Sequence, residues 1–229
     1  MGIFQIGYLY DTFFFSSLPA IFLLFFYYRR LSPPLRILIF YLIASVIMEL
    51  VSTYFINIYN DSLFNIQCNY WPQTSIFFYT LYFYYALRAG KLHLSITGLG
   101  ISCIVGLTAY IALFSTFTTD NSPVTFTVSN LFLLIGVLAQ FYQFIRSIAE
   151  YQLAQHPLFY VNGGLFFYAT TVILAQTGTT LLVMNEEDQT VGGFLWDLSL
   201  VGWIIFNIFL LYAITLEIRQ WDPSLPSSS

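Results

Sequence analysis

The residues best suited to chemistry form a polar stripe in a long apolar segment. Glu49 stands near the middle of the segment from Ile37 to Tyr59, which is otherwise mostly apolar. An acid in the middle of a membrane-spanning helix is costly, and such acids commonly mark ion, proton or ligand sites. At 3.6 residues per turn, four more polar residues share the helix face of Glu49. They are Ser45, Ser52, Thr53 and Asn57.

This polar face predicts a position inside a helix bundle, because lipid offers no hydrogen-bond partner. No Lys, Arg or His lies in the middle of any apolar segment, so Glu49 has no cation to pair with there. A functional interpretation makes Glu49 a ligand contact, a proton relay or a cation site. A structural interpretation makes it a neutral acid that is hydrogen-bonded to a neighbouring helix. Both interpretations remain open at this stage.

Buried amides on other apolar segments extend the candidate site. Together with Glu49 they predict a polar cavity, although any single amide is better explained by ordinary hydrogen bonding between helices. The amides assigned to the candidate site are Gln140, Asn162, Gln176 and Asn207. On the last apolar segment a stripe at helical spacing indicates core packing in preference to a ligand-facing aromatic wall. The stripe contains Trp196, Ser199, Trp203, Asn207 and Leu210.

The sequence lacks the residues that a metal site, a retinal site or a catalytic site would require. His93 and His156 lie in predicted loops with no suitably spaced Cys or second His, so no metal site is predicted. The only lysine, Lys91, also lies in a loop, whereas a retinal Schiff base needs a lysine in the last span. No cofactor is therefore predicted. A lipid-modifying enzyme needs two titratable groups at one depth, and only Glu49 is deep in a span, so no catalytic residue is assigned and enzymatic activity is disfavoured.

The composition indicates an integral membrane protein. Of the 229 residues, 58% are hydrophobic and only 8% are charged, whereas soluble proteins carry about 25% charged residues. The lipid bilayer is therefore the first expected partner. A net charge of −4 and a pI near 4.9 argue against nucleic acid as a partner, because binding it requires a basic surface.

Hydropathy and turn residues divide the chain into one all-α transmembrane domain over 1–216. The fold class is a polytopic seven-transmembrane-helix bundle. A Pro- and Ser-rich tail over 217–229 is predicted to be disordered and too short for a catalytic domain. The loop 29–36 is expected to be non-helical because of Pro33 and Pro34. The predicted spans are 9–28, 37–59, 69–87, 94–114, 124–145, 157–184 and 193–216.

Two further patterns concern topology and packing. All seven Lys and Arg residues fall on one side of this threading. The positive-inside rule then predicts an outer N-terminus and a cytoplasmic C-terminus. In the fourth span, small-xxx-small spacing predicts a close approach to another helix. The small residues are Gly98, Ser102, Gly106 and Ala109.

Three segments carry a resemblance to a known group of proteins. They are Phe141-Tyr142-Gln143-Phe144, the run from His156 to Gly164, and the last span from Trp196 to Asn207. In these segments the chain resembles uncharacterised bacterial seven-helix membrane proteins of about this length, mainly over its second half. It departs from them at Cys68-Asn69 and Tyr82-Phe83, where a His and an acid are common in that family.

The resemblance implies a multi-pass protein of the bacterial inner (cytoplasmic) membrane that works beside a histidine kinase or similar signalling partner. It transfers no catalytic residues, since none is established for that family. The sequence thus predicts a sensory or signal-relay module with a polar intramembrane pocket around Glu49, acting through a separate partner protein. A small transporter or channel with Glu49 as proton or cation site is the alternative, and a structural subunit of a membrane complex is a further one.

Overall fold

The described part of the chain is entirely helical. A computed structural model describes the backbone over residues 3–58, 61–88, 90–114, 123–147, 153–184 and 189–221. Its side chains are described over 15–48, 50–51, 70–88, 90–113, 124–146, 153–178 and 197–221. These residues contain seven long α-helices and no strand.

The helices follow one another with short connections. They are α1 (Ile3–Phe26), α2 (Pro33–Ile58), α3 (Asp61–Ala86), α4 (Lys91–Phe114), α5 (Pro123–Ser147), α7 (Pro157–Met184) and α8 (Gln189–Trp221). A single 3-10 turn, η1 (Tyr28–Arg30), joins α1 to α2. The bounds of α7 are those of the predicted sixth span.

Most helices extend beyond their predicted spans. α1 begins at Ile3 and α3 at Asp61, six and eight residues before the predicted starts, and α4 begins at Lys91, in a segment predicted to be a loop. α2 begins at Pro33, inside the predicted loop, because proline suits a first helical turn, where its missing N–H needs no partner. α8 continues to Trp221, so the first part of the predicted tail is helical. Within this extension Glu217 is only 6% exposed and is hydrogen-bonded to Ser32 of the α1–α2 turn.

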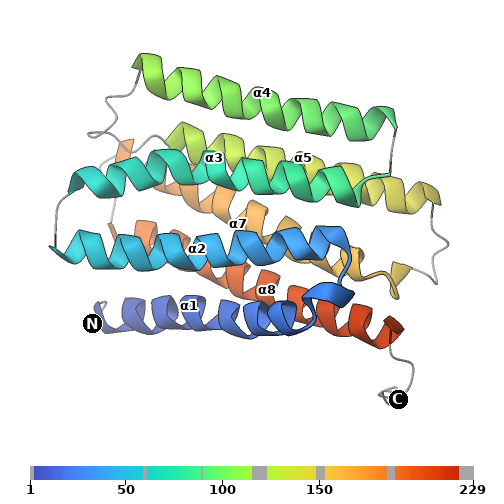
Figure 1. Ribbon diagram of the computed structural model, residues 1–229. Coiled ribbons are helices and arrows are strands. Elements are labelled where there is room, and N and C mark those ends of the chain that lie inside the picture. Colours follow the sequence, from blue (N-terminus) through green and yellow to red (C-terminus); the bar gives the residue numbers. More distant parts are fainter. Residues whose placement is uncertain are drawn as a thin grey trace.

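The seven helices form a ring that closes on itself (Figure 1). Each helix packs against the next, and α8 returns to pack against α1. α3 contacts α2, α4 and α5, which places it toward the middle of the bundle. The most extensive contact joins α7 to α8. Because neighbouring helices run antiparallel, the N-terminal end of α1 and the C-terminal end of α8 lie at opposite ends of the bundle (Figure 1).

Apolar side chains fill the interior of the bundle and also cover much of its outer surface. Within the described residues, four helices are long and apolar enough to cross a membrane: Lys91–Leu113, Val124–Arg146, Pro157–Gly178 and Asp197–Trp221. Shorter apolar stretches cover Phe15–Phe26 and Pro33–Met48. Large apolar groups such as Phe22, Leu94 and Leu113 point outward, 62–75% exposed. A surface of this kind suits lipid better than water, and it indicates a multi-pass membrane protein.

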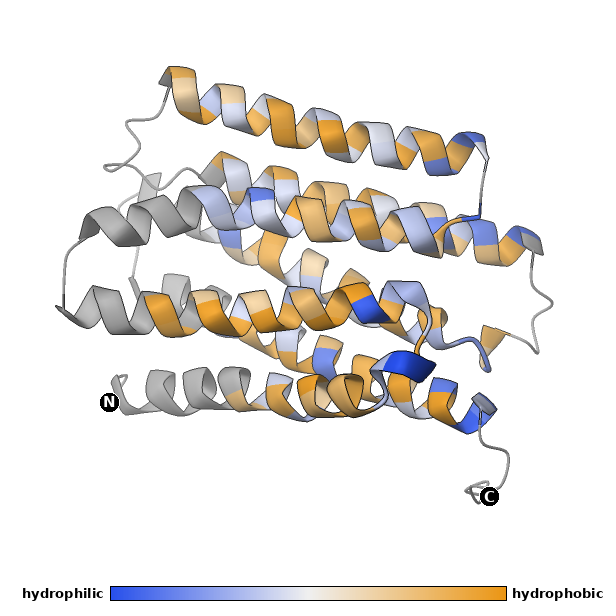
Figure 2. Ribbon diagram, in the orientation of Figure 1, coloured by the Kyte–Doolittle hydropathy of each residue, from blue (hydrophilic) through white to orange (hydrophobic). Residues whose placement is uncertain are grey.

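All the Lys and Arg residues belong to one end of the bundle, where strongly hydrophilic segments gather (Figure 2). They lie on the α1–α2 turn, at the starts of α2 and α4, just after α3, and at the ends of α5 and α8. We call this the basic end. Its members are Arg29, Arg30, Arg36, Arg88, Lys91, Arg146 and Arg219.

The small residues predicted to pack α4 against another helix face outward instead. Gly98, Ser102, Gly106 and Ala109 are all exposed, and a Cβ at Gly98 or Gly106 would meet nothing within 4 Å. Small residues four positions apart can line either a packed or an exposed face of a helix, so the spacing alone does not determine which face is turned inward. Within this chain the packed face of α4 carries Gly100, where a Cβ would lie 2.1 Å from Thr80 Oγ1.

Other glycines permit the close approach of helices. A Cβ at Gly164 would lie 3.0 Å from the backbone Cα of Phe206, so α7 and α8 touch there through their main chains. A Cβ at Gly136 of α5 would lie 2.2 Å from the ring of Phe83 of α3. That ring is fully buried and cannot move aside cheaply.

We therefore expect Gly136→Ala to destabilise the bundle by about 1–3 kcal/mol, the usual cost of overpacking a well-filled core. The matched control is Gly98→Ala, which adds the same methyl group to an open helix face. Unfolding in mixed detergent micelles, followed by circular dichroism, would measure both. Equal stability of the two variants would contradict the packing of α5 on α3.

Candidate functional site

The structure distributes the predicted site residues over four helices. Glu49, Ser52, Thr53 and Asn57 belong to the helical backbone of α2, but their side chains lie outside the described residues. Ser45 of α2 is half-buried. The four amides are buried: Gln140 on α5, Asn162 and Gln176 on α7, and Asn207 on α8. The cavity predicted around Glu49 therefore stays a prediction.

A pair of buried tyrosines joins α2 to α3. The hydroxyl oxygens of Tyr41 and Tyr79 lie 2.6 Å apart and share a hydrogen bond. Both rings are almost completely buried, and their centroids lie 5.1 Å apart. Trp71 of α3 stacks on Tyr41 at 5.9 Å. A buried phenol requires a partner for its hydroxyl, so this pair ties the two helices together at a defined rotation.

The same cluster extends to α7 and α8. Trp203 of α8 packs on Tyr41 at 6.1 Å and on Tyr168 of α7 at 5.1 Å. We call Tyr41, Tyr79, Tyr168 and Trp203 the aromatic layer. Tilted and edge-on ring pairs of this kind contribute about 0.5–1.5 kcal/mol each beyond their area burial. Four helices therefore meet at one level through rings that also carry polar groups.

Two serines connect the aromatic layer to α1. The indole Nε1 of Trp203 donates to Ser17 Oγ over 3.0 Å. The side-chain nitrogen of Asn207, one turn further along α8, donates to Ser16 Oγ at 3.1 Å and to Ser17 Oγ at 3.3 Å. The amide that the sequence assigned to a cavity thus holds α8 against α1. The Trp203, Asn207 and Leu210 members of the predicted core stripe are all buried.

Asn162 has a corresponding role on the other side of the bundle. Its Oδ1 accepts a hydrogen bond from the hydroxyl of Tyr82 on α3 at 3.3 Å, and its Nδ2 donates to the carbonyl of Leu158 at 2.6 Å. Tyr82 and Asn162 are both fully buried. Asn162 therefore serves as a link between α3 and α7.

Two buried amides keep unsatisfied atoms. Gln140 is fully buried, and neither its oxygen nor its nitrogen has a hydrogen-bond partner. Asn207 Oδ1 is likewise without one. A buried polar group without a protein partner costs about 1–3 kcal/mol, and in native proteins it usually binds an ordered water or a ligand. A small polar molecule would therefore gain by binding at Gln140 or Asn207. Among the described side chains, Gln73 Nε2 and His156 Nδ1 are also buried without a partner.

The interior groups described here are phenols, amides, hydroxyls and an indole. They can orient hydrogen bonds, but they provide no acid and base at one depth. No cluster of three or more His, Cys, Asp or Glu suitable for a metal ion occurs among the described residues. The arrangement is suited to holding helices in register and to binding a neutral polar group or water.

Sequence reasoning missed most of the residues that make these contacts. Tyr41, Tyr79, Ser16 and Ser17 are not among the residues predicted from the sequence, and Tyr82 is named there only as a departure from the family pattern. A signal was available for Tyr79, which lies in the middle of its predicted span, away from the membrane interface, and therefore needs an interior hydroxyl partner. Tyr41 also lies one turn before Ser45, on the line that leads to Glu49.

A second polar cluster lies at the basic end. Glu217 of α8 accepts hydrogen bonds from the backbone N–H and from the hydroxyl of Ser32, the latter at 3.1 Å. A pocket of about 340 Å³ adjoins them, with His156 and Trp221 in its wall. Because Ser32 directly precedes α2, these hydrogen bonds hold the end of α8 against the α1–α2 turn.

These features define an all-helical, multi-pass membrane protein with a closed ring of helices and an interior polar and aromatic core. Comparisons with known protein families, with curated proteins and with solved structures found no match. The resemblance to uncharacterised bacterial seven-helix proteins therefore stays a prediction from the quoted segments. The arguments below rest on the geometry of this chain alone.

The link from α1 to α8 can be tested at one hydroxyl. Ser17→Ala removes the acceptor that Trp203 and Asn207 share. Interhelical hydrogen bonds in membranes average about 0.6 kcal/mol, so we expect a loss of roughly 1 kcal/mol in unfolding free energy. Ser102→Ala, at an exposed position of α4, is the matched control and should be nearly neutral. Unfolding curves that coincide would argue against the link.

His156 predicts a dependence of stability on pH. Burial lowers the pKa of its imidazole, and the nearby positive charge of Arg88 lowers it further. Its ring also packs on Phe144 at 5.0 Å. A lowered pKa means that the unfolded chain binds the proton more readily, so stability is present above the ordinary histidine pKa of about 6.5 and is lost as the pH falls below it.

We therefore expect the unfolding midpoint to fall between about pH 7.5 and pH 5, and to fall less in His156→Phe. His93→Phe, which alters the only other histidine, serves as the control and should retain the wild-type dependence. Thermal unfolding in detergent at several pH values would measure both variants. The same pH dependence in His156→Phe as in the wild type would show that His156 does not contribute.

Proposed function

We propose that the chain crosses the membrane seven times, with its N-terminus outside and its C-terminus in the cytoplasm. Two observations support this. The seven helices alternate in direction around one ring, and all seven Lys and Arg residues lie at the same end. Cationic loops favour the cytoplasmic side, so the basic end is assigned to it. Placement in a bacterial inner membrane follows from the sequence resemblance alone.

Within that topology we propose a sensory or signal-relay module whose input lies near Glu49. The observation that carries this proposal is the aromatic layer, which joins α2, α3, α7 and α8 by buried ring contacts. Glu49 lies about two helical turns, roughly 12 Å, from Tyr41 on the same helix. A ligand near Glu49 that shifted α2 would therefore have to disturb contacts shared by the other helices.

Such a relay needs two packings of the bundle to which the ligand binds with different affinity. The aromatic layer lies between Glu49 and the basic end, so it is placed to couple them. Output at the basic end would pass to a separate membrane signalling partner such as a histidine kinase. In support, Trp221 at the end of α8 is 67% exposed beside the pocket closed by Glu217.

One observation favours the alternative, a small transporter or channel. The amide of Gln140 and the Oδ1 of Asn207 are buried without partners, and both lie toward the basic end from the aromatic layer. Waters at these positions would form part of a hydrated path. In that case Glu49 would be the proton or cation site on the other side of the layer, and the tyrosines would act as its gate.

One experiment separates these functions. The wild type and Glu49→Gln would be transferred from their own membrane into lipid nanodiscs and examined by native mass spectrometry. Glu186→Gln, in the acidic segment before α8, is the matched control with the same chemical change. For a sensor, we expect a small molecule retained by the wild type and by Glu186→Gln and lost from Glu49→Gln, because the acid contributes to its binding.

Flux assays on the same three proteins complete the test. Proton or cation flux into liposomes that disappears in Glu49→Gln would contradict the sensor and favour the transporter. A protein retained in fixed ratio, with neither ligand nor flux, would instead favour a structural subunit of a membrane complex.

A further inference from the structure

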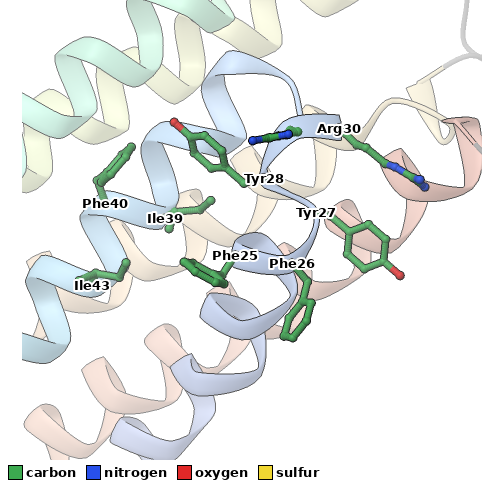
Figure 3. A pocket seen from close by; sticks show the side chains of 9 residues that line it. Phe25, Phe26, Tyr27, Tyr28, Arg30, Ile39, Phe40 and Ile43 are labelled. Atoms are coloured by element: carbon green, nitrogen blue, oxygen red, sulfur yellow. The ribbon is translucent and has the colours of Figure 1, made fainter.

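An apolar groove opens on the outside of the bundle between the end of α1 and the start of α2 (Figure 3). Its volume is about 650 Å³. Phe25 of α1 faces Ile39, Phe40 and Ile43 of α2 across it, and Tyr28 closes its upper end. Phe25 is 71% exposed and Phe40 is 50% exposed, so the groove is accessible from the lipid-facing side.

A second hollow adjoins the first around the end of α1. Its volume is about 510 Å³, and it shares Phe26, Tyr27 and Arg30 with the first. The two hollows therefore flank the last turn of α1, and both reach the turn that carries Arg29 and Arg30. An apolar space that ends at a pair of cations has the chemistry of a lipid site, since acyl chains need the apolar wall and an anionic headgroup needs the cations.

The two arginines are available to a ligand. Both are exposed. Among the described residues, neither side chain forms an ion pair or a side-chain hydrogen bond. Figure 3 shows Arg30 extending from the turn past Tyr27. Guanidinium groups bind phosphate oxygens through two parallel hydrogen bonds, which gives them an advantage over a point charge.

A third arginine, Arg36, holds the turn that carries Arg29 and Arg30 in place. Arg36 donates from Nε to the carbonyl of Leu31 at 2.7 Å and from a terminal nitrogen to the carbonyl of Arg29 at 3.2 Å. Its guanidinium also lies 5.5 Å from the centroid of the Tyr28 ring, and that ring packs edge-on against Phe40 at 6.2 Å. These contacts hold the turn that carries Arg29 and Arg30 in a fixed position relative to the apolar wall of the groove.

From this geometry we infer that the α1–α2 turn is a binding site for an anionic phospholipid. The phosphate binds between Arg29 and Arg30, one acyl chain lies in the groove between Phe25 and Phe40, and the second hollow takes the other chain. Arg36 is a positioning residue. The inference depends on the membrane location of the bundle and not on the sensory role, so either can fail without the other.

The test uses nanodiscs that contain equal amounts of phosphatidylglycerol and phosphatidylcholine. Native mass spectrometry of the full chain then gives the ratio of the two lipids retained. We expect the wild type to prefer phosphatidylglycerol. Arg29→Gln/Arg30→Gln should lower that preference about 25-fold, because each arginine near the surface contributes roughly a factor of five.

The matched control removes the same charge elsewhere at the basic end. Lys91→Gln/Arg146→Gln alters two exposed cations on α4 and α5, away from the groove, and should stay within about twofold of the wild type. If the double arginine variant does not fold, the single variants Arg29→Gln and Arg30→Gln should each lower the preference about fivefold.

A second pair of variants tests the groove without changing charge. Ile43→Trp fills it and should reduce the phosphatidylglycerol retained, whereas Leu94→Trp, on the exposed face of α4, should not. Three outcomes would overturn the site: no preference for phosphatidylglycerol in the wild type, an equal loss in both charge variants, or displacement of the lipid by soluble glycerol phosphate.

Discussion

A polar group inside a lipid-facing bundle must find its partner within the protein, because lipid offers none. The interior of this chain is organised around that constraint. Tyr41 pairs with Tyr79, Tyr82 with Asn162, and Trp203 and Asn207 with the serines of α1. Each pair comes from different helices, so each one sets the rotation of a helix as well as its position. The residues that satisfy the constraint also close the ring from α8 to α1.

At the basic end, too, polar side chains find hydrogen-bond partners on other segments of the chain, although this region is only partly buried. Glu217 accepts hydrogen bonds from Ser32, and Arg36 donates to carbonyls of the same α1–α2 turn. The turn is therefore held from α8 on one side and from α2 on the other. The proposed lipid site uses this turn, and the proposed relay ends beside it. An anionic lipid bound there would contact the α1–α2 turn, to which Glu217 of α8 is hydrogen-bonded. The lipid composition of the membrane would then affect the packing of α8 at the basic end.

Much of the helical framework could be predicted, but little of the site. Pro157 and the acidic segment after Met184 bound α7 where hydropathy placed its ends. Asn207 and Trp203 were correctly placed on a buried stripe of α8. In contrast, Glu217 was assigned to a disordered tail because polar, Pro-rich sequence follows it, and its buried position depends on Ser32, which is far away in the chain. Gly98 and Gly106 were expected to pack and do not, since Gly100 takes the packed face.

Composition and hydropathy alone indicate that the chain is apolar and helical, where most helices end, and that its cations share one end. These properties are local: a helix needs only hydrogen bonds between neighbouring turns, and hydropathy is a sum over adjacent residues. The packing of whole helices determines which face of α4 is turned inward, that Tyr41 pairs with Tyr79, and that Ser17 accepts a hydrogen bond from Trp203. Those pairings depend on the rotation and offset of whole helices, which side-chain packing sets across the bundle and no short stretch of sequence contains.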